Sequence, residues 1–280
     1  MVNHALQHVL LSPHFDDVVF SCGALVAQWA RSGQRVAIVT ICAGLPPAGP
    51  LSAYASKLHR RWSPQLESLP AQMVAQRRAE DLRAADMLGA MAIHLTVPDC
   101  IYRLNPDGGW LYEGHAQIFG ALHAAEQHLP RQIAQQLVRI SGVTAATRIW
   151  TPLALGNHVD HQLVRAAAQQ CALPGQRGYY EDYPYAEDAA AIAGITLPSS
   201  GLAAHALPIS AQDLGTKLAA IGAYKSQLSS FWIDGAEMRQ RVTDYALLVG
   251  TGAPGERMWI REELKAGAQD IRSKQPPILF

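Results

Sequence analysis

The feature that most constrains the fold is a pair of apolar runs near the start of the chain, with a helix-forming segment between them. Residues 8–13 form a short apolar run that stops at a proline, and residues 35–43 form a second run rich in β-branched side chains. Residues 18–30 have helical periodicity, which Ser32 and Gly33 end. Strand, helix and strand within about 35 residues form a βαβ unit, which requires a parallel sheet with a right-handed crossover.

The rest of the chain continues this alternation. The expected helices cover residues 71–88, 115–140 and 211–224, and the expected strands cover residues 92–97, 148–153, 178–183, 204–209, 245–249 and 258–260. Neither an internal repeat nor a linker separates a second unit. The sequence therefore predicts a single α/β domain over residues 1–280, with a mostly parallel sheet flanked by helices.

Three segments are expected to form loops. Residues 45–70 are rich in Pro, Ser and Gly and have no clear period, so we expect a mobile wall or lid at the mouth of a site. Residues 103–113 contain Asp-Gly-Gly between aromatic positions, which is typical of a hairpin or loop. Residues 250–255 match G-x-G-x-x-G, but Pro254 lies inside the match and too little chain follows for a dinucleotide site.

Composition excludes several classes of function. Lys+Arg and Asp+Glu are both 23, so the formal net charge is zero and no nucleic-acid partner is expected. The start of the chain has no basic leader, and no stretch approaches the roughly 18 apolar residues of a membrane helix. The four cysteines are widely spaced, which is typical of reduced core thiols. We therefore expect a cytoplasmic protein without a membrane partner.

The first cluster of reactive side chains lies where the first strand ends and the first helix begins. It contains His14, Asp16 and Asp17, at the end of a strand where ligands bind in open α/β sheets. Adjacent side chains at such a turn point in different directions, so one carboxylate can ligate a metal while the other handles a proton. The alternative is that Asp16 or Asp17 simply caps the helix.

The second cluster, His158, Asp160 and His161, follows the strand expected at residues 148–153. An H-x-x-H pair is a weak signal alone, but these side chains share a rim of the sheet with His14. Two imidazoles and one carboxylate form a zinc set with a position left for water, and the same donors suit ferrous iron. Zinc brings the pKa of bound water toward about 7 and polarises an amide carbonyl. A free carboxylate and a second histidine would then supply base and acid or oxyanion stabilisation.

Taken together, the two motifs resemble those of the PIG-L/LmbE-like N-acetylglucosaminyl deacetylases. The matching segments are Pro13-His14-Phe15-Asp16-Asp17 and His158-Val159-Asp160-His161. The resemblance implies a Rossmann-like α/β fold, with His14, Asp17 and His161 as zinc ligands, Asp16 as general base, His158 stabilising or protonating the tetrahedral intermediate, and Asp160 orienting a histidine. Phe15 replaces a proline common in the family, and Asn157 replaces a common glycine. These departures affect the substrate range more than the chemistry.

Weaker similarities concern the substrate. Arg77, in the R-x-x-E…L-G helix, lies near the substrate by this resemblance, and the segment from Lys217 to Gln227 is similar to a late family helix. The alternative for Arg77 is a solvated helix face that pairs with Glu80. Asp99 either accepts a sugar hydroxyl or belongs to a turn. The aromatic residues 179–183 are more typical of a strand edge than of a substrate wall.

These features predict a zinc-dependent hydrolase that removes an N-acyl group, N-acetyl in particular, from an amino-sugar-like small molecule. One alternative is an amidase or deacylase acting on a secondary metabolite or a thiol conjugate. Another is a non-catalytic sugar-binding module, although binding alone would not require both Asp16 and His158. A homo-oligomer is compatible with the sequence.

Overall fold

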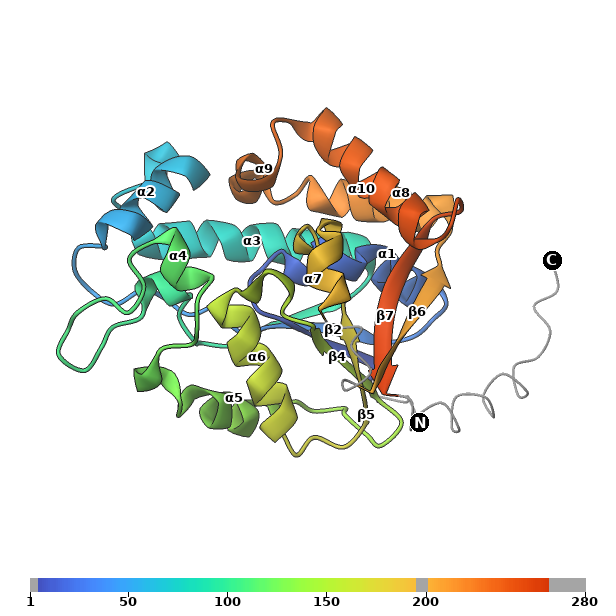
Figure 1. Ribbon diagram of the computed structural model, residues 1–280, viewed down its shortest axis with the longest axis horizontal. Helices are drawn as coiled ribbons and strands as arrows, with labels where there is room; N and C mark the ends of the chain where they lie inside the picture. Colours follow the sequence, from blue (N-terminus) through green and yellow to red (C-terminus); the bar gives the residue numbers. More distant parts are fainter. Residues whose placement is uncertain (1–4, 195–200, 262–280) are drawn as a thin grey trace.

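The computed structural model describes residues 5–194 and 201–261, and within them the chain forms a seven-stranded sheet in the order β3-β2-β1-β4-β5-β7-β6 (Figure 1). The strands are β1 (His8–Ser12), β2 (Val36–Thr40), β3 (Met91–His94), β4 (Arg148–Pro152), β5 (Gln176–Tyr180), β6 (Leu202–Pro208) and β7 (Gly255–Arg261). The first five are parallel, whereas β7 runs antiparallel to both β5 and β6. The predicted mostly parallel α/β fold is confirmed.

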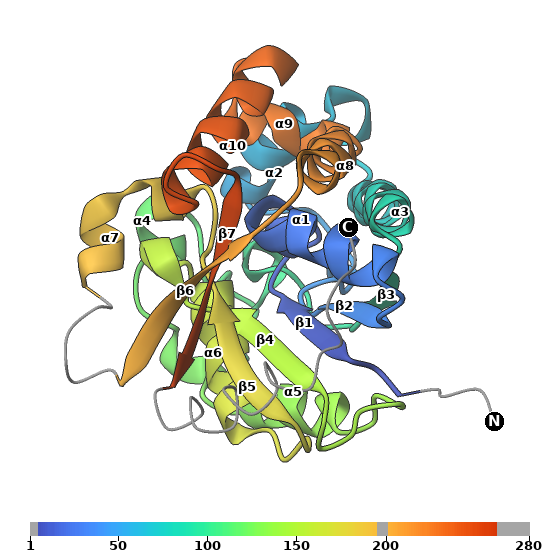
Figure 2. The same ribbon diagram turned by 90° about the vertical axis from the view of Figure 1, so that its right-hand side faces the viewer.

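Helices cover both faces of the sheet, as Figure 2 shows. Helices α1 (Asp17–Arg31), α3 (Pro70–Leu88) and α8 (Ala211–Ile221) lie on one face, and α5 (Leu129–Leu137) and α6 (Val159–Gln170) lie on the other. Leu10 packs with the first group of helices, while its neighbours Val9 and Leu11 pack with the second. Burial of both faces explains why β1 is a continuous apolar run rather than an alternating pattern.

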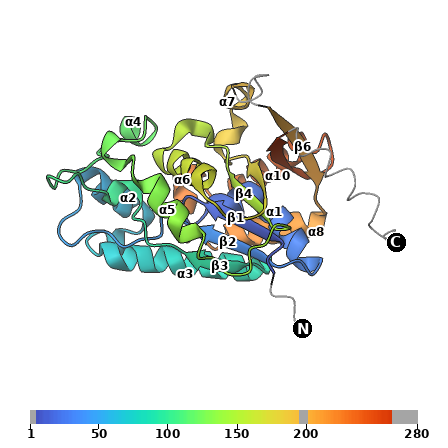
Figure 3. The same ribbon diagram turned by 90° about the horizontal axis from the view of Figure 1, so that it is seen from below.

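The remaining elements gather mainly around one end of the sheet. They are α2 (Ala53–Trp62), α4 (His115–Ile118), α7 (Ala189–Ala193), α9 (Lys225–Phe231) and α10 (Gly235–Val249), with short 3₁₀ turns at Pro64–Leu66, Cys100–Tyr102, Ala124–Glu126, Leu155–Asn157 and Tyr185–Glu187. Figures 1 and 3 both place α2 and α4 at the same end of the molecule. Within residues 5–194 and 201–261, no helix is both long and apolar enough to cross a membrane.

The order of the strands reverses between β1 and β4, and this point locates the site. Strand β1 pairs with β2 on one side, Ser12 facing Thr40, and with β4 on the other, Leu10 facing Trp150. The chain leaves β1 and β4 toward opposite faces, so a crevice opens beyond their carboxyl ends. His14 follows β1 and His158 follows β4 by way of a short turn.

Three expectations about elements were wrong. Residues 45–70 contain helix α2, which Ser52 caps by accepting a hydrogen bond from the Ala55 backbone N–H at 3.0 Å. The expected helix over residues 115–140 is divided into α4 and α5, because Gly120 follows the first and Pro130 belongs to the opening turn of the second. Residues 245–249 are not a strand but the last part of α10, which begins after Asp234 caps it.

Other expectations about loops and cysteines are confirmed. Leu104 and Trp110 form an isolated antiparallel bridge, so residues 103–113 are hairpin-like. Residues 250–254 connect α10 with β7, and Gly255, the last residue of the match, begins this strand rather than a helix. All four cysteines are free and buried.

Candidate metal and catalytic site

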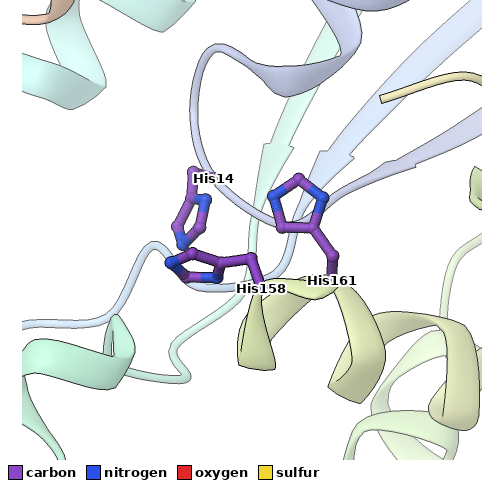
Figure 4. Close-up of side chains that lie close together, drawn as sticks. All are labelled: His14, His158 and His161. Atoms are coloured by element: carbon purple, nitrogen blue, oxygen red, sulfur yellow. The ribbon is translucent and has the colours of Figure 1, made fainter. Parts of the chain in front are cut away.

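The two predicted clusters meet at the switch point of the sheet. His14 lies in the loop after β1, and His158 and His161 lie where α6 begins (Figure 4). Each of the three imidazoles offers a nitrogen, and these nitrogens lie within 4.8 Å of one another. The loop is held by two local hydrogen bonds: Ser12 Oγ donates to the His14 carbonyl at 2.6 Å, and the His14 backbone N–H donates to Asp17 at 2.7 Å.

Asp17 completes the constellation between two of these histidines. Its Oδ2 lies 3.2 Å from His14 Nδ1 and 3.4 Å from His161 Nε2. The other nitrogen of His161, Nδ1, lies 2.6 Å from Asp182 Oδ1. If Nδ1 carries the proton, His161 Nε2 presents a lone pair, and this buried atom has no hydrogen-bond partner among the described residues. Two nitrogens and a carboxylate that converge in this way fit a divalent metal ion.

The electrostatics of this group suit a cation. Burial alone would lower the pKa of His14, but Asp17 and Asp160 raise it well above the usual value. Burial also opposes protonation of His161, yet Asp17 and Asp182 raise its pKa to about 9. Against its own burial, Asp17 has a pKa held well below the usual value by His161 and His14. The negative charges of these carboxylates therefore favour a cation between His14 and His161.

Asp16 has a different environment although it is adjacent to Asp17. It occupies the residue before α1, but its side chain makes no capping hydrogen bond, so the helix-cap alternative does not describe this carboxylate. It is 4% exposed, and its Oδ1 lies 3.9 Å from Arg77 Nη2. Burial and the charge of Asp17 raise the pKa of Asp16 to about 6, although Arg77 acts in the opposite direction.

Arg77 and Asp99 lie beside this carboxylate. Arg77 is 4% exposed, so the expectation of a solvated helix face is wrong for this residue. Its Nη1 lies 3.4 Å from Asp99 Oδ2, and its guanidinium lies over the rings of Phe15 and Trp62 at 5.2 and 4.6 Å from their centroids. Arg77 is thus fixed between two carboxylates and two aromatic rings.

Asp160 and His158 complete the histidine side of the site. Asp160 is fully buried, and its Oδ2 lies 2.9 Å from His14 Nε2. The Asp160 backbone N–H donates to His158 Nδ1 at 3.2 Å. Burial and the neighbouring His14 lower the pKa of His158 well below the usual value. Asp160 thus contacts one of the two histidines by its side chain and the other by its backbone.

Two residues that hold this site were missed in the sequence. Asp182 follows the carboxyl end of β5, on the same rim as the other clusters, so the rule that located His14 could have found it. Arg103 forms ion pairs with Asp160 and Glu126. Its position in a loop between weakly patterned segments gave no local signal for that pairing.

The site opens into a cavity of about 340 Å³. His14, Asp16, Asp17, Arg77, Asp99 and His158 all line it, so the structure brings these predicted residues to one place. His161 and Asp160 are buried beneath them. The segment 45–70 also lies here, because Tyr54, Leu58, Arg61 and Trp62 of α2 form part of the wall. Its predicted position at the mouth of the site is therefore confirmed.

The fold and the site together define a Rossmann-like α/β protein with a cluster of candidate metal ligands at its switch point. The sequence profile of the PIG-L family, the GlcNAc-PI de-N-acetylases, matches residues 9–172, and the chain belongs to this family.

Two curated relatives are each a 2'-N-acetylparomamine deacetylase. The one from Niallia circulans is 26% identical over 185 residues, which cover 63% of this chain and 66% of the relative. The one from Streptomyces fradiae is 32% identical over 182 residues, which cover 64% of this chain and 57% of the relative. The matched part thus spans between about three fifths and two thirds of the length of these relatives.

Similar solved structures cover most of the chain. A zinc-inhibited form of teicoplanin deacetylase superposes with a TM-score of 0.75 at 29% identity, covering 90% of this chain and 96% of that one. A deacetylase of A40926 pseudoaglycone gives a TM-score of 0.65 at 28% identity, covering 91% and 96%. The N,N'-diacetylchitobiose deacetylase of Pyrococcus horikoshii, at 16% identity and a TM-score of 0.53 over 92% of this chain and 85% of that one, shares the fold.

Proposed function

We propose that this chain is a metal-dependent amide hydrolase that removes an N-acetyl group from an amino-sugar-like small molecule. The observation that carries the proposal is the convergence of Asp17 with His14 and His161, while the adjacent Asp16 stays apart beside Arg77. A metal-ligand set and a separate buried carboxylate are the two parts that hydrolysis of an amide by activated water requires.

His14 Nδ1, Asp17 Oδ2 and His161 Nε2 would hold the metal ion. Zinc is the proposed ion, and ferrous iron accepts the same donor set. When bound, the ion supplies a Lewis acid that polarises the amide carbonyl and makes a water molecule more acidic. Asp182 and Asp160 fix the two imidazoles, because each contacts the ring nitrogen that faces away from Asp17.

Asp16 acts as the general base. It accepts a proton from the water molecule that attacks the amide carbon and passes that proton to the departing amine. A carboxyl group with a pKa of about 6 suits both transfers near neutral pH. Arg77 helps to keep the Asp16 carboxylate in place. The nearest atoms of the two side chains are 3.9 Å apart, so they do not form a short ion pair.

His158 stabilises the negative charge that develops on the carbonyl oxygen. Because its Nδ1 accepts the Asp160 backbone N–H, the neutral ring carries its proton on Nε2 and can donate it in a hydrogen bond. The lowered pKa keeps this imidazole neutral, so its Nε2–H donates a hydrogen bond to the carbonyl oxygen and does not act as an acid.

The molecule that carries the acyl group is proposed to be a glycosylated secondary metabolite. The similar proteins are deacetylases of 2'-N-acetylparomamine and of teicoplanin, which favours this class over a thiol conjugate. Small glycan-like molecules are therefore the substrates to test first.

The test combines metal analysis with amine release. The purified chain, loaded with zinc, should release free amine and acetate from 2'-N-acetylparomamine or N-acetylglucosamine, and a chelator should abolish the release. Asp17→Ala should lose both the metal and the activity. Binding of these compounds without amine release, with metal present, would instead support the non-catalytic sugar-binding module.

A further inference from the structure

The cavity beside the proposed catalytic residues has an apolar wall that the hydrolysis of an acetamide does not require. Tyr54, Leu58 and Trp62 are spaced four residues apart along α2, so they lie on one face of that helix. All three line the cavity, and all three are half-buried against the core. Helix α2 thus presents a continuous apolar stripe to the substrate space.

Apolar side chains from two other segments face the same space. Ile118 and Phe119, at the end of α4, and Phe231, at the end of α9, also line the cavity. The ring of Phe119 lies 5.2 Å from that of His158, measured between centroids. These walls therefore extend to the catalytic groups themselves.

Helix α2 is fixed in this position. The Arg61 guanidinium donates hydrogen bonds to the Ser229 carbonyl from Nε at 3.0 Å and from Nη2 at 2.6 Å. This contact ties α2 to the neighbouring helix α9 (Figure 1), which contributes Phe231 to the same cavity. The apolar stripe is a built part of the site.

Some polar groups of the cavity already have partners within the protein, although His115, Tyr185 and Ser230 also line it. Asp99 pairs with Arg77, Gln227 donates to Ser226 Oγ at 3.0 Å, and Arg61 donates to Ser229. A sugar hydroxyl buried against the α2 stripe would lose its hydrogen bonds to water. An alkyl or aryl group would lose none and would remove both itself and the wall from water.

We propose that the preferred substrate carries an alkyl or aryl group close to its acylated amine, and that Leu58 and Phe119 determine this preference. This inference rests on the proposed function and names the substrate class of the same site. The apolar group belongs either to the acyl chain or to the group linked to the sugar. Both have the same chemistry at the wall, and the substrates below distinguish them.

The experiment compares kcat/KM for three compounds: N-acetylglucosamine, its hexyl β-glycoside, and N-hexanoylglucosamine. Each methylene removed from water strengthens binding by about fourfold. The kcat/KM of the hexyl β-glycoside or of N-hexanoylglucosamine should therefore exceed that of N-acetylglucosamine by roughly tenfold or more. The gain should come mainly from a lower KM. A preference for the glycoside assigns the wall to the linked group, and a preference for the hexanoyl compound assigns it to the acyl chain. Equal kcat/KM for all three compounds would overturn the proposal.

Variants locate the preference. Leu58→Gln should reduce the advantage of the hexyl compound to within about threefold, since a polar side chain of similar length no longer provides apolar contact. Phe119→Leu, a second variant on the opposite wall, should reduce it in the same direction. Lys57→Gln is the matched control, because Lys57 is an exposed neighbour on α2 that does not line the cavity. An unchanged preference in folded Leu58→Gln and Phe119→Leu would overturn the assignment.

Calorimetry with hexyl β-glucoside, which has no amide, separates this inference from the proposed function. Binding that Leu58→Gln weakens, without hydrolysis of any acetamide, would support the apolar site and reject the hydrolase. Hydrolysis of N-acetylglucosamine without any binding of hexyl β-glucoside or preference for a hexyl compound would do the reverse.

Discussion

Asp16 and Asp17 are neighbours in the sequence, yet the fold gives them opposite environments. Asp17 lies between His14 and His161, which hold its pKa well below the usual value against the effect of burial. Asp16 lies beside Arg77, and burial and Asp17 raise its pKa to about 6. Two carboxylates whose pKa values are separated in this way can perform a ligand role and a proton-transfer role at the same pH.

We expect Asp16→Asn to separate these roles. The amide keeps the size of the side chain but cannot accept a proton at neutral pH, so kcat should fall by roughly 10²–10⁴ while bound metal stays at the wild-type level. KM should change little if Asp16 acts mainly in the transition state. Steady-state kinetics together with metal analysis would check this. A near-wild-type kcat would remove Asp16 from the mechanism.

His8 is a buried titratable residue that has a structural role and takes no part in the proposed chemistry. It lies in β1, stacked on Trp29 with ring centroids 3.8 Å apart. Its Nδ1 accepts a hydrogen bond from Trp150 Nε1 at 3.1 Å, and its Nε2 lies 2.8 Å from Gln34 Oε1. Protonation of Nδ1 would bring its N–H against the Trp150 N–H, so that two donors would face each other. Burial lowers the pKa of His8 from 6.5 to about 4.

This residue should make the folded state less stable in mild acid. Because the unfolded chain binds the proton first, stability is complete above pH 6.5 and falls as pH decreases from there toward 4. Between pH 7 and pH 5, His8 should account for about 2 kcal/mol of the lost free energy of unfolding. Urea titrations of wild type and His8→Phe at both pH values would measure it. The variant should lose less stability over this interval, and parallel losses in both proteins would refute the assignment.

Sequence reasoning located the reactive residues that follow strand ends and missed those that support them. His14 and His158 were found because each follows a recognisable apolar run. Arg103 reaches Asp160 across 57 positions and Glu126 across 23, and such a pairing depends on the packing of a loop rather than on any local pattern. The position of residues 45–70 at the site was predicted, but the helix α2 and its apolar face toward the cavity were not.

At the scale of elements, helix α1 contains a break that a strand and a helix from the last part of the chain stabilise. Its backbone is non-helical at Cys22, with φ −135° and ψ 28°. The Glu256 carboxylate of β7 accepts hydrogen bonds from the Ala24 and Leu25 backbone N–H groups at 3.2 and 2.7 Å. Lys217 of α8 lies 2.7 Å from Glu256 and donates to the Ser21 carbonyl at 3.1 Å. The buried ion pair thus satisfies the backbone groups released by the break.

Removing one member of this pair should be costly. Glu256→Leu would leave Lys217 buried without its partner and two N–H groups without an acceptor, so we expect a loss of roughly 3–5 kcal/mol in the free energy of unfolding. The comparison is Arg241→Ala, which removes a more exposed pair with Glu187 and should cost less than about 1 kcal/mol. Urea unfolding measures both. Similar losses would show that the helix break does not depend on Glu256.

The elements that were misassigned have no distinct local signature. Residues 245–249 are an apolar run that a strand or a buried helix could equally contain, and the capping Asp234 lies ten residues earlier, outside that run. Helix α2 follows a Pro- and Gly-rich stretch, and its apolar face contacts the cavity rather than a neighbouring strand. By contrast, β1, β2 and β4 were predicted because complete burial requires continuous apolar runs.

For the whole molecule, the site depends on the topology of the sheet. His14 and His161 belong to segments separated by more than a hundred residues, and they meet only because β4 pairs with β1. The loop after β1 and the start of α6 also contact each other through the hydrogen bond between His14 and Asp160. A ligand held by both segments should therefore stabilise the folded chain as a unit.

We expect zinc to raise the melting temperature of the metal-free protein through this link. At a free zinc concentration about 100 times Kd, binding contributes about 2.7 kcal/mol, which corresponds to a rise of roughly 5–10 °C for a chain of this size. Differential scanning calorimetry with and without zinc would measure the shift. Asp17→Ala should abolish it because that side chain lies between both histidines, whereas Asp16→Asn should retain it because Asp16 faces Arg77 instead. An equal shift in Asp17→Ala would mean that zinc binds elsewhere, and no shift in wild type would reject His14, Asp17 and His161 as the ligands.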